Sequence, residues 1–185
     1  MVWYLEHGGE VPVMGFTPDG EYPIINGEKG IMNCVYARKL NQTGAYRLTR
    51  FEGGTASNVS PAYAVAELAC PAEAAGRITL DKVTATPIDG GIRVEAEGIS
   101  AHGSTPEQGE NAIGRLALAL TQLPLEGELA DCMAFLADRI GLETRGESLG
   151  LAMRDDLSGD LTVNLGVAAF AEDTLSLTLS VRYPV

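Results

Sequence analysis

Residues 98–112 read Gly-Ile-Ser-Ala-His-Gly-Ser-Thr-Pro-Glu-Gln-Gly-Glu-Asn-Ala and separate an expected strand from an expected helix. Before this stretch, apolar and charged residues alternate over 92–97, which is the period of a half-buried strand. After it, apolar residues recur at helical spacing over 112–123, and Pro124 ends the pattern. The polar loop therefore holds His102, one of only two histidines, between two anchored elements, where binding and catalytic side chains are often found.

The remaining patterns extend this arrangement of strands and helices. Strands are predicted at 30–40, 46–52, 62–69, 82–87, 91–98, 161–169 and 175–181, with 46–52 as a partner of 30–40. Helices are predicted at 72–78, at 111–123, within 128–142 and, as a short turn of helix, around 147–151. Asp89-Gly90 predicts a hairpin, as does the four-residue link at 171–174. We therefore predict an α+β fold, ferredoxin-like in part, in which an antiparallel sheet carries helices packed on one face.

Composition limits the classes of function. The 185 residues can form one compact domain or two small lobes, and a hydrophobic content of 45% is enough for a core. The net charge of −12, from 25 acids and 13 bases, disfavours nucleic acid and anionic membranes as partners. No apolar run approaches the length of a membrane span, and no signal peptide is recognisable. Three widely spaced cysteines show neither metal-ligand nor disulfide spacing, which predicts a reducing cytoplasm.

Two groups of residues carry a resemblance to a known family. The first comprises Ser100-Ala101-His102, Pro106-Glu107, Gly109 and Asn111-Ala112-Ile113, and the second comprises Phe16-Thr17-Pro18-Asp19, Tyr22-Pro23 and Glu28-Lys29-Gly30. Both resemble dinuclear-zinc dipeptidases of the dipeptidase V or Xaa-His (carnosinase-like) type, in the clan of the aminoacylases and succinyl-diaminopimelate desuccinylase. The resemblance covers almost the whole chain. It implies that residues 1–27 are a remnant of the catalytic domain and that residues 28–185 form a partial or two-lobed lid domain.

The resemblance also implies roles for four residues. The lid histidine, His102 here, hydrogen-bonds the carbonyl oxygen of the scissile bond, and Asp19 is a zinc ligand. Arg182 binds the C-terminal carboxylate of the substrate, for which the planar guanidinium fork is suited. Asn58 helps to bind the substrate or the oxyanion, although its spacing to Pro61 differs by one residue from the family pattern. Without the resemblance, each of these residues has a simpler interpretation as a turn, cap or solvated surface residue.

Several motifs of the family are absent from the sequence. These are the His-x-Asp ligand pair, the Glu-Glu pair that supplies the general base and a ligand, and a C-terminal histidine ligand. We therefore expect a lid-domain fragment of a zinc-dependent, cytoplasmic dipeptidase that is inactive alone and binds no zinc tightly. The full-length enzyme would hold two zinc ions, act on dipeptides and pair through its lid as a homodimer.

Two other interpretations stay open at this point. One is a free-standing α+β module for dimerisation or for binding a small ligand. The other is a serine hydrolase that uses Ser100 or Ser104 with His102, although no Gly-x-Ser-x-Gly elbow occurs and residues so close on one loop rarely reach triad geometry. A longer reading frame that carries the missing motifs would favour the dipeptidase interpretation over both.

Overall fold

The computed structural model describes Tyr4, residues 6–11, Val13, Ile25 and residues 27–184. The strands are β1 (Gly30–Lys39), β2 (Arg47–Gly53), β3 (Val59–Ser60), β4 (Tyr63–Ala69), β5 (Val83–Ile88), β6 (Gly91–Glu97), β7 (Ala101–His102), β8 (Arg154–Asp155), β9 (Gly159–Asp160), β10 (Thr162–Ala171) and β11 (Thr174–Tyr183). The α-helices are α2 (Ala112–Leu120) and α3 (Gly127–Arg139), and the 3₁₀ helices are η1 (Ala72–Arg77) and η2 (Pro106–Gln108).

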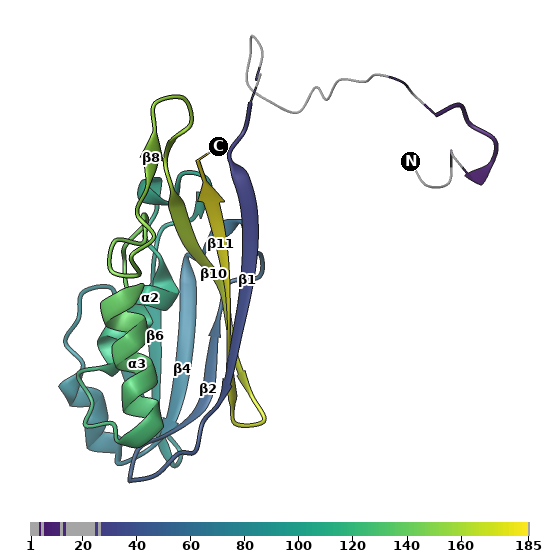
Figure 1. Cartoon of the computed structure of the whole chain (residues 1–185). Helices are drawn as coiled ribbons and strands as arrows, with labels where there is room; N and C mark the ends of the chain where they lie inside the picture. Colours follow the sequence, from purple (N-terminus) through teal and green to yellow (C-terminus); the bar gives the residue numbers. More distant parts are fainter. Residues whose placement is uncertain (1–3, 5, 12, 14–24, 26, 185) are drawn as a thin grey trace.

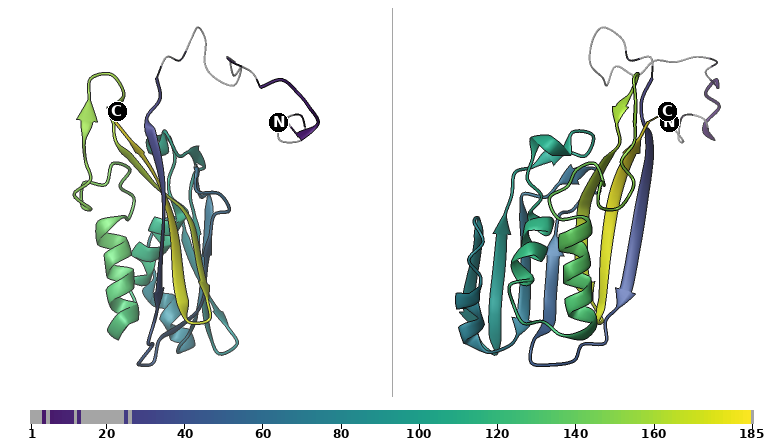
Figure 2. Two further views of the ribbon diagram at one scale, coloured as in Figure 1. Left: turned by 45° about the vertical axis from the view of Figure 1, so that its right-hand side comes forward. Right: turned by 60° about the vertical axis from the view of Figure 1, so that its left-hand side comes forward.

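Seven strands form one antiparallel sheet in the order β1-β11-β10-β2-β4-β6-β5 (Figure 1). Two small ladders, β3 with β7 and β8 with β9, complete the strand pairing. The edge-on view in Figure 2 shows both α-helices on one side of the large sheet, which leaves the other face open. The predicted α+β class, with an antiparallel sheet and helices on one face, is confirmed.

The core lies between the sheet and the two α-helices. Alternate residues of the strands point into it, and the largest of its fully buried side chains include Phe51, Leu68, Ile92, Ile113 and Leu116. Helix α2 begins at this core because the side chain of Asn111 caps it. The Asn111 carboxamide oxygen accepts hydrogen bonds from the backbone N–H groups of Ile113 and Gly114, at 3.0 and 3.2 Å. No helix in the described part of the chain is long and apolar enough to cross a membrane.

The partner predicted for the first strand is wrong. β1 pairs with β11 over all ten of its residues, from Gly30 opposite Tyr183 to Lys39 opposite Thr174. β2 pairs instead with β4 and, over two residues, with β10. Neighbours in sequence often pair, but a strand of this length finds more ladder bonds beside the equally long β11 than beside the seven-residue β2.

The segment between α3 and β10 also differs from expectation. The short helix predicted around 147–151 is absent from the structure, which has hydrogen-bonded turns there. The small β8–β9 hairpin follows, and the sequence pattern did not indicate it because each strand has only two residues. Local polar spacing cannot separate a turn from one turn of helix, since both use the same short-range bonds.

Gly114, in the first turn of α2, lies directly against the backbone that follows α3. A Cβ atom placed there would lie 1.7 Å from the carbonyl oxygen of Gly141, which is far inside van der Waals contact. Glycine at this position therefore lets the first turn of α2 pack directly on the backbone that follows α3.

We predict that Gly114→Ala destabilises the fold. Alanine favours a helix by about 0.8–1.0 kcal/mol over glycine, but forcing an extra methyl group into a packed contact costs about 1–3 kcal/mol. The midpoint of urea unfolding, followed by circular dichroism, should therefore fall. Gly76→Ala is the matched control, since a Cβ atom there meets nothing within 4 Å. Equal midpoints for the two variants would show that the helices do not meet as described.

Candidate functional site

The candidate site lies at the end of the sheet where β11 finishes, near the C-terminal label in Figure 1. Two connections meet the sheet there. The first, the Asn58 loop, comprises residues 54–58 between β2 and β3. The second, the His102 turn, comprises residues 102–105 and begins at the last residue of β7. The ladder between β3 and β7 joins them, because Val59 pairs with His102 and Ser60 with Ala101.

The His102 turn fixes the ring of its histidine through the Nδ1 atom. The Oγ atom of Ser104 lies 2.7 Å from Nδ1, and the backbone N–H of Ser104 donates to the same atom at 3.3 Å. A backbone N–H can only donate, so Nδ1 is the acceptor and the neutral ring carries its proton on Nε2. The His102 side chain is exposed. The turn thus leaves the Nε2–H group of His102 as a hydrogen-bond donor at this end of the sheet.

Asn58 lies directly against the His102 turn. Its backbone carbonyl oxygen accepts a hydrogen bond of 2.7 Å from the N–H of Gly103. A Cβ atom at Gly103 would lie 3.1 Å from the Asn58 backbone, so a larger residue would crowd this contact. The Asn58 side chain is exposed. Two residues that the sequence singled out separately are therefore neighbours in space.

Arg182 reaches the same end of the sheet from β11. It pairs with Thr162 of β10, and directly opposed residues of an antiparallel pair share one face. The Thr162 hydroxyl donates to the carbonyl oxygen of Gly103 at 3.3 Å, which connects this pair to the His102 turn. The Nε atom of Arg182 is buried and has no hydrogen-bond partner among the described residues. Asp19, the fourth predicted site residue, lies outside the described residues.

An ion cluster closes the base of the connection that carries His102. Ile99 and Glu110 exchange two backbone hydrogen bonds of 2.9 Å each. The Glu110 carboxylate then binds Lys82, at 2.6 Å, and the largely buried Arg115. The hydrogen bond from Lys82, with further attraction from Arg115, lowers the pKa of Glu110 below its ordinary value. The loop is therefore tied to β5 and α2 at its base and to β3 near its tip.

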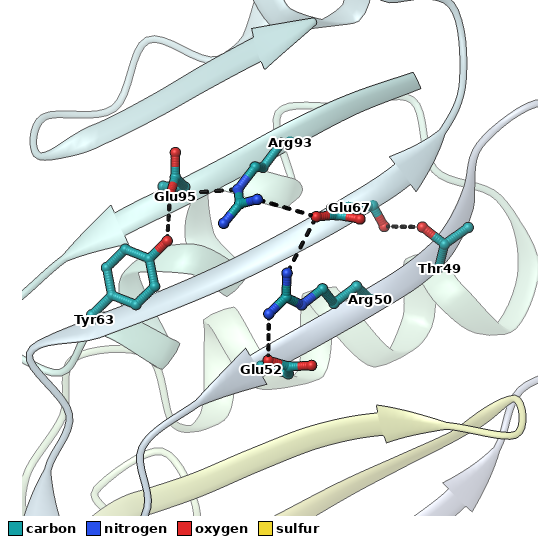
Figure 3. Close-up of polar contacts among 7 residues, drawn as sticks. All are labelled: Thr49, Arg50, Glu52, Tyr63, Glu67, Arg93 and Glu95. Atoms are coloured by element: carbon teal, nitrogen blue, oxygen red, sulfur yellow. Dashed lines mark hydrogen bonds and ion pairs between the residues drawn. The ribbon is translucent and has the colours of Figure 1, made fainter. Parts of the chain in front are cut away.

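A second polar cluster covers the open face of the sheet, on β2, β4 and β6 (Figure 3). Arg50 pairs with Glu52 at 2.7 Å, and Glu67 lies between Arg50 and Arg93, at 3.4 and 3.5 Å. The Tyr63 hydroxyl donates to Glu95, and this bond raises the pKa of Tyr63. Because each charge has an opposite partner, on its own strand or on a neighbouring one, this cluster is a polar covering of the open face rather than a reactive site.

The sequence patterns missed two polar residues that hold the site, Thr162 and Asn164. Both lie on β10 and are almost fully buried, with exposed fractions of 6% and 1%. The amide of Asn164 donates to the carbonyl oxygen of Ser57 at 2.8 Å. A signal existed in the sequence, since these polar residues interrupt an apolar strand, but nothing local indicated what they would bind. In the described ranges, no three or more His, Cys, Asp or Glu residues are grouped so as to hold a metal ion.

The chain is similar in sequence to several known proteins. Residues 90–170 match the family described as a peptidase dimerisation domain, M20_dimer. The chain is 34% identical to a Beta-Ala-Xaa dipeptidase of Lactobacillus delbrueckii subsp. lactis, over 98% of the chain and 41% of that protein. It is 31% identical to the putative dipeptidase YtjP of Bacillus subtilis, over 98% of the chain and 42% of that protein. A putative dipeptidase of Staphylococcus epidermidis is also 31% identical, over 95% of the chain and 40% of its own length.

The chain therefore spans about two fifths of the length of these relatives. The match runs from β6 to nearly the end of β10, so it includes the His102 turn, Thr162 and Asn164 but neither Asn58 nor Arg182. Residues 90–170 are thus similar to a peptidase dimerisation domain, and the fold and the relatives together support an M20-family dipeptidase lid, or dimerisation, domain.

Proposed function

We propose that the chain is the lid-domain part of a zinc-dependent dipeptidase. Residues 28–185 would form the lid, and residues 1–27 would belong to the catalytic domain, with Asp19 as a zinc ligand. One observation carries the proposal. Asn58, His102 and Arg182 come from three separate segments, yet Asn58 and His102 adjoin Gly103, and Arg182 lies opposite Thr162, whose hydroxyl donates to Gly103.

His102 would act on the carbonyl oxygen of the scissile peptide bond. Negative charge builds on this oxygen as the carbonyl carbon is attacked, and a fixed N–H donor stabilises that charge more than it stabilises the bound substrate. The Nε2–H group of His102 meets this requirement because the Ser104 backbone holds Nδ1 as an acceptor. No proton needs to leave the ring in this role.

Arg182 and Asn58 would orient the substrate. The guanidinium group can grip a C-terminal carboxylate with two parallel hydrogen bonds, which fixes both the position and the direction of a dipeptide. The exposed carboxamide of Asn58 can donate to a substrate carbonyl or to the developing oxyanion beside His102. These groups bind and orient, and they leave the activation of water to the remainder of the enzyme.

The metal chemistry would therefore not depend on the described residues. A zinc site normally needs three or four protein ligands, and the described part of the chain offers no such group. The resemblance implies two zinc ions in the full-length enzyme, bound mainly by its catalytic domain. For that enzyme we also propose a cytoplasmic location, in keeping with three free cysteines, and possible pairing of two lids as a homodimer.

The serine hydrolase interpretation is disfavoured by the way in which Ser104 meets His102. The Ser104 hydroxyl shares Nδ1 with its own backbone N–H, which is a local turn bond. A nucleophile and base need a third group that orients the far side of the ring, and no hydrogen bond from the described residues to Nε2 is found. The geometry supports a serine that fixes the ring, not one that attacks the substrate.

The first test of the proposed function removes the imidazole. In the full-length enzyme, His102→Ala should lower kcat by about a hundred- to thousandfold, since losing one oxyanion donor costs about 2.7–4 kcal/mol. Zinc content, measured by atomic absorption, should stay normal. Ser104→Ala is the matched control and should retain most activity, because the backbone N–H still orients Nδ1. A near-normal kcat for His102→Ala would remove the assigned role, and an inactive Ser104→Ala would favour the serine hydrolase.

The second test concerns the substrate carboxylate. Arg182→Lys should raise KM for dipeptides by about tenfold or more, because one ammonium group cannot copy two charge-assisted hydrogen bonds. Steady-state kinetics with a C-terminally amidated dipeptide provides the comparison, since that substrate has no carboxylate to grip. Equal losses on both substrates would mean that Arg182 does not bind the carboxylate.

The third test concerns zinc. The isolated 185-residue chain should bind no Zn²⁺ tightly, because Asp19 alone cannot complete a coordination shell. Isothermal titration calorimetry with Zn²⁺ should show no submicromolar site. A tight site that disappears in Asp19→Asn would overturn this expectation and would require further ligands from residues 1–27.

A further inference from the structure

The Asn58 loop rests on strand β10, and Asn164 is the side chain that holds it there. The Asn164 Nδ2 atom donates to the carbonyl oxygen of Ser57 at 2.8 Å. The side chain is 1% exposed, and its Oδ1 atom has no hydrogen-bond partner among the described residues. A buried amide with this single bond is a strong restraint, since breaking the bond leaves both groups unpaired away from water.

Backbone contacts hold the loop against the same strand. Gly166 lies at the bulge of β10, and a Cβ atom there would lie 2.4 Å from the oxygen and 2.5 Å from the Cα atom of Ser57. A Cβ atom at Gly54, whose φ is +68°, would lie 1.9 Å from the carbonyl oxygen of Gly166. Loop and strand are therefore in direct backbone contact at Gly166, two residues beyond Asn164, which leaves the loop little freedom to shift.

This contact continues to the candidate site. Ser57 precedes Asn58, whose carbonyl oxygen binds the N–H of Gly103 at 2.7 Å. Thr162, two residues before Asn164 and on the same face of β10, donates to the carbonyl oxygen of Gly103. β10 therefore holds the Asn58 loop through Asn164 and the His102 turn through Thr162.

We propose that Asn164 is a positioning residue for the reaction, acting through Ser57 to place Asn58 and, through Gly103, His102. The inference rests on the proposed function, because it assigns Asn164 to the same site. Asn164 itself is buried and touches neither substrate nor metal. Its contribution is geometric, since a displacement of about 1 Å in catalytic groups can cost about a hundredfold in rate.

Ser180 offers a matched control on the neighbouring strand. It pairs directly with Asn164, shares its face of the sheet and is equally buried, with an exposed fraction of 1%. Its hydroxyl has no hydrogen-bond partner among the described residues. Ser180→Ala therefore changes a buried polar group beside Asn164 without touching the loop.

The first arm of the test needs no activity. Amide hydrogen exchange, followed by NMR on this chain, should become about tenfold faster at Gly103 and Val59 in Asn164→Ala. Amides of the β4–β6 ladder should keep their rates, and Ser180→Ala should match the wild type throughout. Gly166→Ala would displace the same loop by a steric clash while keeping the Asn164 side chain. It should speed exchange at the Gly103 and Val59 amides as well, and it is the second variant to measure if Asn164→Ala does not fold. Unchanged loop exchange in a folded variant would overturn the anchoring.

The second arm measures catalysis in the full-length enzyme. Asn164→Ala should lower kcat by about ten- to hundredfold and change KM less, because Arg182, which would bind the substrate carboxylate, lies on another strand. In a variant that already lacks the Asn58 and His102 side chains, Asn164→Ala should have an effect of about twofold at most. A purely structural role would persist in that background and would overturn the proposal.

The two arms separate failure of this inference from failure of the proposed function. If His102→Ala and Asn58→Ala both keep normal kcat, the proposed function is wrong, and the positioning role falls with it even if exchange shows that Asn164 anchors the loop. If those variants are impaired while Asn164→Ala keeps normal kcat, the proposed function stands and the positioning role is wrong.

Discussion

The arrangement of the site depends on the two faces of strand β10. One face presents Val163 and Leu165 to the core beneath the helices. The other presents Thr162 and Asn164, which are buried because loops cover them and which donate hydrogen bonds to carbonyl oxygens of those loops. Successive side chains of a strand point to opposite faces, so β10 can fill the core with one face and hold the loops with the other. The register that buries Val163 and Leu165 therefore also fixes the positions of Thr162 and Asn164. A slip of one residue would exchange the two faces and lose both.

The loops can lie so close because glycine occupies the contact points. Gly54, Gly103 and Gly166 each stand where a Cβ atom would crowd the backbone of another segment. These contacts replace side-chain packing with backbone packing, which is stiffer because the backbone has fewer rotatable bonds. The Asn111 cap extends the same principle to α2, since its Nδ2 atom donates to the carbonyl oxygen of Leu165 while its oxygen caps the helix. Helix, loops and sheet are thereby joined at β10.

The chemistry of His102 is decided more locally than its position. The two bonds to Nδ1 come from Ser104, two residues away, so the tautomer follows from the turn itself. Where the ring points depends on the β3–β7 ladder and on the closure of the loop base by Glu110 and Arg115. The short-range contact with Ser104 thus fixes which ring nitrogen of His102 can donate, and contacts between distant segments fix where the ring lies.

The sequence by itself determined most elements and the α+β class, because burial on one face imposes a period on each strand and helix. It also indicated Asn58, His102 and Arg182, through turn chemistry, loop position and family resemblance. Only the tertiary structure decided that β1 pairs with β11, that Asn58 and His102 adjoin Gly103, and that Arg182 lies opposite Thr162, which binds Gly103. Local patterns record which face of a segment is buried, whereas strand partners and loop contacts depend on how all segments share one core and on where glycines permit close approach.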